Sequence, residues 1–273
     1  MKRNFGLLLV AAASWSANAA APAPETVAFQ SGDKLLHGYL YKPAGKGPFP
    51  AVLYNHGSSP GLVNNAAFEA IAPHFIESGW VFFAPYRRGQ GLSEDAGRYV
   101  LDRFKEAESP SARDAMAVKL LSGEQLDDEL AAVRWLDSRS FVQARRTAVM
   151  GNSFGGIETV FGAERYAYCA AVNLSGAAMS WDEAPALRAR LIESVRHTRA
   201  PLLFIQAEND FSTEPSKVLY ASAREAHKEA QIHIYPPFKG AGEDGMQGHS
   251  FAWLGVSEWF PEAFAFISTH CRN

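Results

Sequence analysis

The apolar residues of this chain fall into short runs that alternate with amphipathic stretches. Mostly apolar runs occur at 51–54, 81–84, 147–150, 170–174, 201–206 and 232–235. Short runs without polar alternation are typical of strands that are buried on both faces of a sheet. Because helical patterns separate most of these runs, we predict an α/β fold, with a mostly parallel central sheet and helices on both of its faces.

The clearest helical pattern follows the first of these strands. Phe68, Ile71, Ala72, Phe75 and Ile76 recur at intervals of three and four residues and form one apolar stripe. Gly79 comes next and is suited to the left-handed residue that ends a helix. The same reasoning predicts helices at 126–138, 154–163, 215–229 and 256–270, and it predicts a hairpin of strands at 27–30 and 35–41.

Two segments interrupt the alternation. Residues 94–123 are polar, irregular and too long for a simple crossover, and residues 179–198 have helical character but form an excursion between two strands. Ligands of open α/β sheets bind beyond the carboxyl ends of the strands, so segments inserted at that edge are placed to cover a site. Each segment is interpreted either as part of a small lid or as an elaborated crossover.

The amino terminus has the pattern of a secretory signal peptide. Lys2 and Arg3 precede an apolar run at 5–13, which is too short to span a bilayer, and small residues at 17–19 suit signal peptidase. We therefore expect a signal peptide at 1–19, a single globular domain at 20–273, and a periplasmic or secreted bacterial protein. The alternative is a buried amino-terminal helix.

Composition narrows the possible partners. The chain has 273 residues, of which 47% are hydrophobic, and a formal net charge of −3. Without a basic patch, nucleic acid is not expected as a partner, and no later segment is apolar for long enough to predict stable membrane insertion. Cys169 and Cys271 either form a disulfide, which an oxidising compartment permits, or remain two separate buried thiols.

The strongest chemical signal is Gly151-Asn152-Ser153-Phe154-Gly155. This G-x-S-x-G sequence lies between a predicted strand and a predicted helix, which is the setting of a nucleophile elbow. The turn is so tight that side chains two residues before and two residues after the serine would clash. Ser153 is therefore the candidate nucleophile, and a turn without chemistry is the alternative.

With this motif the chain resembles the α/β-hydrolase superfamily, and within it the esterases related to dienelactone hydrolase and the prolyl-oligopeptidase-like enzymes. The resemblance spans roughly residues 35–270 and implies a nucleophile, an acid and a histidine in that order. It places the acid at Asp210, after the strand at 201–206, with Glu208 as a rival. It places the histidine at His249, in a flexible loop before the final helix.

The resemblance also implies donors for a developing oxyanion. The backbone N–H of Phe154 is one, and the turn after the strand at 51–54 supplies the other, from Ser58 or else Ser59. His56 is expected to be a structural residue of that turn. In the sequence Arg87-Arg88-Gly89 and beyond, one arginine is expected to anchor the loop after the following strand.

One departure from the family concerns the nucleophile. Dienelactone hydrolases proper use cysteine, whereas this chain has Ser153, and that favours a general carboxylesterase over a dienelactone hydrolase. Aromatic residues near the three candidates in sequence are expected either to line an apolar acyl pocket or to belong to the core: Phe154, Trp181, Phe211, Phe251 and Trp253.

These features predict a secreted serine hydrolase that cleaves carboxylic esters through an acyl-enzyme on Ser153. No cofactor and no metal are expected, because zinc-type spacings and phosphate loops are missing from the sequence. The alternatives are a peptidase or a thioesterase or acyltransferase with the same three residues, and a catalytically silent binding protein. The partner is expected to be a small-molecule ester, and the protein a monomer or a homodimer.

Overall fold

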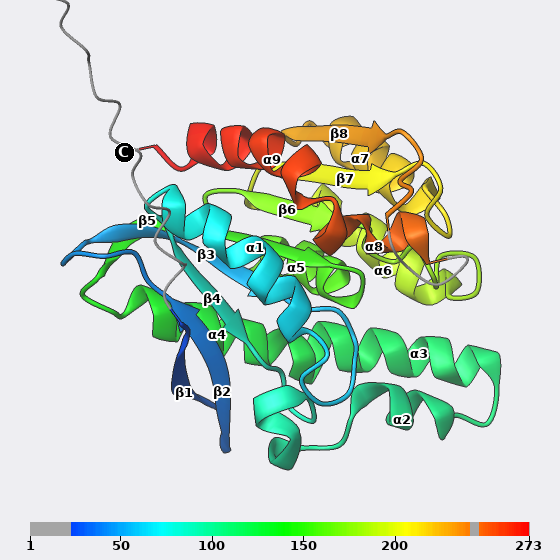
Figure 1. Ribbon diagram of the computed structural model, residues 1–273. Helices are drawn as coiled ribbons and strands as arrows, with labels where there is room; N and C mark the ends of the chain where they lie inside the picture. Colours follow the sequence, from blue (N-terminus) through cyan, green and yellow to red (C-terminus); the bar gives the residue numbers. More distant parts are fainter. Residues whose placement is uncertain (1–22, 241–245, 273) are drawn as a thin grey trace, which may run out of the picture.

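The computed structural model describes residues 23–240 and 246–272. Within them, eight strands form one sheet in the order β1-β2-β4-β3-β5-β6-β7-β8 (Figure 1). β2 pairs antiparallel with β1 and β4, and all other neighbours are parallel. The strands are β1 (Glu25–Ser31), β2 (Lys34–Tyr41), β3 (Phe49–Asn55), β4 (Val81–Pro85), β5 (Val142–Asn152), β6 (Ala171–Leu174), β7 (Leu202–Ala207) and β8 (Ala230–Tyr235).

Helices cover both faces of this sheet. They are α1 (Asn65–Glu77), α2 (Val100–Lys105), α3 (Pro110–Leu120), α4 (Leu126–Asp137), α5 (Phe154–Arg165), α6 (Pro185–Arg196), α7 (Glu214–Glu225), α8 (Gln247–Leu254) and α9 (Val256–His270), with a 3-10 segment η1 (Gly91–Ala96) and a π segment η2 (Leu121–Gln125). One core cluster joins the sheet to α4, α5, α6 and α7, and the other joins it to α1, α8 and α9. Successive residues of one strand belong to alternate clusters: Leu53 lies in the first cluster, whereas Val52 and Tyr54 lie in the second. The predicted mostly parallel α/β sheet, covered on both faces, is confirmed.

The hydrophobic pattern located the strands and most helices correctly. Every predicted apolar run contributes to a strand, although β5 extends beyond the run at 147–150 on both sides. Gly79 lies just beyond α1 with φ +78°, as expected for a left-handed helix end. The helix predicted at 215–229 ends earlier, at Glu225, because the chain turns out of the helix at His227, which has φ +57°.

The segment 94–123 is largely helical, so its interpretation as irregular was wrong. It contains the end of η1, all of α2 and α3, and part of η2. Ser109 caps α3, because its hydroxyl accepts a hydrogen bond from Ala112 N at 3.1 Å, and Pro110 occupies the first helical position, where its fixed φ suits a helix start. In the segment 179–198, α6 supplies the helical character that was predicted.

A disulfide joins Cys169 to Cys271, which decides between the two alternatives for these cysteines. It ties the end of the last helix to the residues before β6, and Arg146 Nε also donates to Cys271 O at 2.6 Å. The predicted signal peptide at 1–19 lies outside the described residues.

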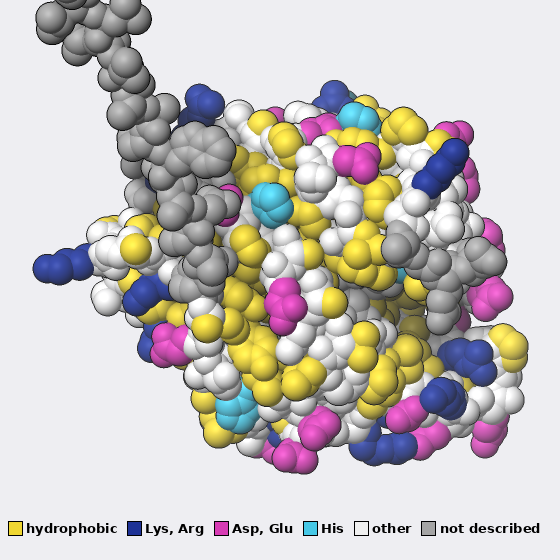
Figure 2. All heavy atoms as spheres, viewed as in Figure 1, with side chains coloured by type: hydrophobic (Ala, Val, Ile, Leu, Met, Phe, Trp, Pro, Cys, Tyr) yellow, Lys and Arg dark blue, Asp and Glu magenta, His cyan; other side chains and the backbone are white. Residues whose placement is uncertain are grey.

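The surface offers no extended basic patch on the face drawn in Figure 2. Among the side chains described on that face, Lys and Arg are interspersed with Asp and Glu around its edge, and hydrophobic side chains gather over its centre (Figure 2). No helix among residues 23–240 and 246–272 has the length and apolar character needed to cross a membrane.

Candidate active site

Ser153 lies on a strained turn between β5 and α5. Its φ of +55° is in the left-handed region, which non-glycine residues rarely adopt, and such strain is concentrated at functional sites. A Cβ at Gly155 would clash with Asn55 O, and a Cβ at Gly151 would clash with Gly155 O. The two glycines therefore allow the turn that G-x-S-x-G predicted. Ser153 N donates to Leu174 O at 2.9 Å, which fixes the turn to the end of β6.

Asp210 lies just after β7, at the carboxyl edge of the sheet, and is buried. Its Oδ2 accepts a hydrogen bond from Gln206 Nε2 at 2.8 Å, and its Oδ1 accepts one from Phe211 N at 2.7 Å. Burial alone would raise the pKa of Asp210, but the interactions with His249, Gln206 and Ser175 outweigh it and hold the pKa below the usual value. Asp210 is therefore a carboxylate at neutral pH.

His249 pairs with this carboxylate. Its Nδ1 lies 2.8 Å from Asp210 Oδ1, and both side chains are almost completely buried. Nε2 is also buried and has no hydrogen-bond partner among the described residues. The rival acid Glu208 is exposed to solvent. The structure thus brings Asp210, and not Glu208, to the imidazole.

The predicted loop position of His249 was wrong, because His249 is the third residue of α8. This short helix packs against α1 and β7. A Cβ at Gly248 would clash with the backbone of Asn209, so the missing side chain lets α8 approach the turn that carries Asp210. Gly248 therefore helps to bring His249 to its partner.

The two predicted oxyanion donors lie beside Ser153. Phe154 is the first residue of α5, so its N–H has no acceptor within the helix. Ser58 lines the same cavities as Ser153, and its hydroxyl lies 3.0 Å from the hydroxyl of Tyr99. Ser59 lines only one of these cavities. Ser58 therefore borders the space at Ser153, and its role as the second oxyanion donor stays a prediction.

His56 is fixed within the turn that carries Ser58. Its Nδ1 lies 3.1 Å from Asn64 Nδ2, and Arg87 Nη2 donates to His56 O at 2.7 Å. Burial, and then the charge of Arg87, hold the pKa of His56 well below its usual value, so the ring is neutral. Arg88 holds Asp128 through Nε and Nη2 at 2.9 and 2.6 Å. Both arginines thus anchor their loop.

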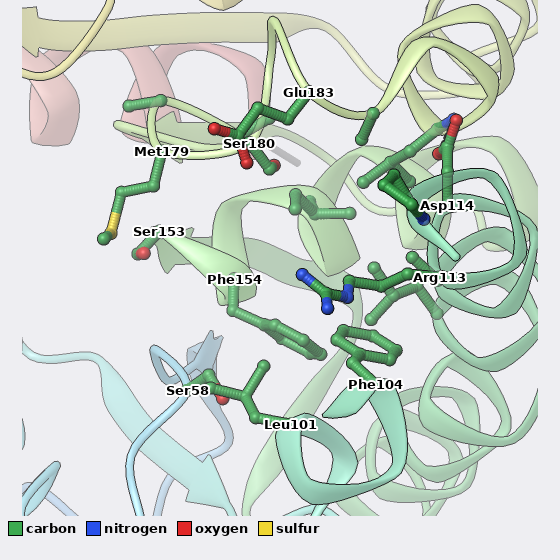
Figure 3. A pocket seen from close by; sticks show the side chains of 18 residues that line it. Ser58, Leu101, Phe104, Arg113, Asp114, Ser153, Phe154, Met179, Ser180 and Glu183 are labelled. Carbon is green, nitrogen blue, oxygen red and sulfur yellow. Dashed lines mark hydrogen bonds between the residues drawn. The ribbon is translucent and has the colours of Figure 1, made fainter. Parts of the chain in front are cut away.

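A cavity of about 760 Å³ extends from Ser153 toward the two segments, 94–123 and 179–198, that interrupt the alternation of strands and helices (Figure 3). Ser153 and Phe154 lie on one side of it, and Arg113 and Asp114 of α3 lie across from them (Figure 3). Most of its wall is apolar and comes from Leu101, Phe104, Ala117, Leu121, Ile157 and Leu187. Both inserted segments therefore build the site, and movement as a lid remains a prediction.

A second cavity of about 230 Å³ is also lined by Ser153, together with His249 and Trp253. Phe211 is exposed at 46%, and its ring centroid lies 5.4 Å from that of His249. Trp181 and Phe251 are instead buried in the two core clusters and line none of the described cavities. Of the aromatic candidates, Phe154 and Trp253 are those that line a cavity.

Sequence reasoning missed most of the larger cavity's wall, together with Gln206. The wall residues come from segments that were recognised only as interruptions, although Ala117 and Leu121 do carry helical spacing. Gln206 sits inside an apolar strand, and a polar residue in such a strand was the available signal. Among the described residues, no group of three His, Cys, Asp or Glu side chains is placed to hold a metal ion.

Solved structures share this fold at low sequence identity. A Klebsiella pneumoniae protein described as a dienelactone hydrolase aligns at TM-score 0.64 and 17% identity, over 90% of this chain and 98% of its own. An esterase of Pyrococcus furiosus aligns at 0.64 and 15%, over 91% and 93%. A puromycin-hydrolysing peptidase of Mycobacterium tuberculosis aligns at 0.68 and 16%, over 93% of this chain but 40% of its own.

The family assignment comes from the sequence. A search of curated proteins gives no match. The profile of the dienelactone hydrolase family, by contrast, matches residues 36–262, which is most of the chain and includes all three candidate catalytic residues. This protein therefore belongs to the dienelactone hydrolase family.

Proposed function

We propose that this hydrolase is a serine carboxylesterase that forms an acyl-enzyme on Ser153. One observation carries the proposal: His249 has its Nδ1 held by the ionised Asp210 and its buried Nε2 unpartnered among the described residues, and His249 and Ser153 line the same cavity. An imidazole fixed in this way is suited to take the proton of the serine hydroxyl.

The proposed reaction has two halves. Ser153 Oγ attacks the ester carbonyl carbon while its proton passes to His249 Nε2, and the oxyanion is held by the N–H groups of Phe154 and Ser58. The bond to the alcohol oxygen then breaks, and that oxygen receives the proton from Nε2. Water repeats the sequence on the acyl-enzyme, releases the acid and restores Ser153. Asp210 remains ionised and stabilises the imidazolium.

We also propose that the mature protein works in the periplasm or outside the cell. The signal-like residues 1–19 support this location, and the disulfide between Cys169 and Cys271 is typical of an oxidising compartment. Fractionation of cells that produce the full chain tests it. Recovery of the uncleaved protein in the cytoplasm, with both thiols free, would contradict the proposal.

The activity is tested with p-nitrophenyl butyrate and with labelling by a fluorophosphonate. Ser153→Ala and His249→Gln should each lower kcat/KM by at least about 10⁴-fold, and Ser153→Ala should abolish labelling. Ser78→Ala and His233→Gln, which change the same residue types outside the site, serve as matched controls and should keep the activity. The absence of both turnover and labelling in the wild-type protein would refute the proposal and favour a silent binding protein.

A further inference from the structure

Two cavities of unequal size meet at the nucleophile. Ser58, Ser153 and Met179 line both of them. The larger, of about 760 Å³, continues between α3 and α6, and the smaller, of about 230 Å³, continues toward α1 and α8. A substrate whose reacting bond lies at Ser153 therefore has one group in each cavity.

The position of His249 makes the two cavities chemically different. His249 lines the smaller cavity and not the larger one. In ester cleavage the alcohol oxygen must receive the proton that Ser153 gave to His249, so this oxygen has to lie on the side of the imidazole. The acyl group, which stays on Ser153 after the alcohol leaves, is then directed away from His249.

We propose that the larger cavity receives the acyl group and the smaller cavity the alcohol, so that the preferred substrates are esters of bulky apolar acids with short alcohols. The assignment rests on the proposed esterase function. In the step it describes, the bond from Ser153 Oγ to the acyl carbon forms, the bond from that carbon to the alcohol oxygen breaks, and the proton passes through His249 Nε2 to the alcohol.

The walls of the larger cavity favour an apolar acyl group. Apolar side chains from α2, α3, η2, α5 and α6 line it, and apolar surface that is buried there adds to binding. Arg113 and Glu183 also line the cavity, but they are exposed and opposite in charge. Asp114, the third charged residue of the wall, accepts backbone hydrogen bonds at both carboxylate oxygens, so the wall has no net positive charge that would favour an ionised acyl group.

Asp114 is the positioning residue of this cavity. It is a buried carboxylate on α3 that accepts hydrogen bonds from Ala186 N at 2.6 Å and Leu187 N at 3.0 Å, at the start of α6. These bonds connect the two inserted segments across the larger cavity. The size of that cavity thus depends on a contact that does not involve the catalytic residues.

An isomeric pair of esters separates the two orientations. Ethyl octanoate and octyl acetate have the same atoms, but the eight-carbon chain is on the acid in the first and on the alcohol in the second. Followed by titration of the released acid, kcat/KM for ethyl octanoate should exceed that for octyl acetate by at least about tenfold. Equal rates, or faster cleavage of octyl acetate, would overturn the assignment.

Two alanines of equal exposure provide matched variants. Ala117 lines only the larger cavity and Ala67 only the smaller one, and each is 7% exposed. Ala117→Leu should lower the ratio of ethyl octanoate to octyl acetate turnover by at least about threefold, and Ala67→Leu should raise it by a similar factor. The opposite pair of changes would overturn the assignment.

A third variant examines the connection between the segments. Asp114→Ala should raise KM for ethyl octanoate more than it lowers kcat, whereas Asp114→Asn, which keeps one acceptor oxygen, should restore part of the affinity. A purely structural role would lower the activity on both esters alike.

The experiments distinguish a failure of the cavity assignment from a failure of the proposed esterase function. Fluorophosphonate labelling of Ser153 with the wrong ester preference would refute the assignment alone. Loss of both labelling and turnover would refute the esterase and the assignment together.

Discussion

The molecule buries two groups of charged side chains, and they differ in how completely their atoms are bonded. In the group of Asp210 and His249, every buried polar side-chain atom has a partner except His249 Nε2. In the group of Arg87, Glu129 and Glu158, two nitrogens of Arg87 and both oxygens of Glu158 have no hydrogen-bond partner among the described residues. The first group leaves only His249 Nε2 without a partner, whereas the second leaves several buried polar atoms without a hydrogen bond.

This difference extends to protonation. Interactions with His249 hold the pKa of Asp210 low despite burial. Burial raises the pKa of Glu158 well above its usual value, and Arg87 opposes that rise only in part. Changes in the first group should therefore affect the rate, and changes in the second should affect stability.

The largest effect is expected from Asp210→Asn. The amide cannot stabilise the imidazolium in the same way, so kcat on p-nitrophenyl butyrate should fall by about 10⁴-fold while the protein stays folded by circular dichroism. Glu208→Gln is the matched control and should retain the activity, because Glu208 is exposed and does not meet the imidazole. If Glu208→Gln is the inactive variant instead, the assignment of the acid is wrong.

The next largest effect is expected from removal of Arg87, and it should appear in the free energy of unfolding. Arg87→Met removes the hydrogen bond to His56 O and the positive charge that lowers the pKa of the buried Glu158, and the loss of such a charged hydrogen bond costs about 3 kcal/mol. Urea denaturation measures the loss. The double variant Arg87→Met/Glu158→Leu should recover the part of the loss that comes from the buried Glu158, and Glu158→Gln alone should be milder. If the double variant is no more stable than Arg87→Met, the two side chains are not coupled.

Glu129→Gln tests the same group through pH. Burial raises the pKa of Glu129 to about 8 in the folded state, whereas the usual value is 4.5. Between these values the folded state holds more protons than the unfolded chain, so the contribution of Glu129 to stability falls as pH rises. Glu129→Gln removes this titration. The free energy of unfolding of the variant, relative to that of the wild-type protein, should therefore increase from pH 5 to pH 9 by an amount on the order of 3 kcal/mol.

Urea denaturation at pH 5, 7 and 9, with the disulfide oxidised, measures this difference. Glu77→Gln, which changes an exposed glutamate outside both groups, is the control. A stability difference between Glu129→Gln and wild type that does not change with pH would contradict the raised pKa.

Local patterns predicted the elbow and the sheet, because both depend on neighbouring residues. Ser153 needs only the glycines on either side and a strand-to-helix junction, and each apolar run needs only its own composition. The acid was predicted from the family order, but its choice over Glu208 depends on where α8 packs. The helical state of His249 depends on Gly248 and Asn209, which are far apart in sequence but adjacent in the fold.

The cavity walls could not be predicted in the same way. Phe154 and Trp253 line cavities, whereas Phe251 lies in the core although it is only two residues from His249 in sequence, and Trp181 lies in the core as well. Whether an aromatic side chain points into a cavity or into the core depends on how whole helices pack. The same holds for α3, which was predicted to be irregular because its residues are polar. Its cap at Ser109 and its contacts with α6 make it a helix that forms one wall of the larger cavity.

The smallest effect on activity is expected from a change of Gln206, which contacts the catalytic group through Asp210. Its amide donates to Asp210 Oδ2 and to Ser212 O, and its Oε1 accepts from Ser216 Oγ at 2.7 Å. Gln206→Met removes these bonds but leaves Asp210 paired with His249. The loss of one hydrogen bond to the carboxylate is worth about 1 kcal/mol, so kcat should fall about fivefold.

The separation of kcat from KM decides whether Gln206 acts through Asp210. Gln206 lines neither of the two cavities at Ser153, so KM for p-nitrophenyl butyrate should stay close to that of the wild-type protein. Gln231→Met, an exposed change on the neighbouring strand β8, should alter neither constant. A rise in KM without a fall in kcat would mean that Gln206 shapes the substrate site and not the carboxylate. A loss of kcat as large as that of Asp210→Asn would mean that the function of the Asp210 carboxylate depends on Gln206 as much as on His249. The catalytic group would then depend on its buried neighbours, as the group around Arg87 does.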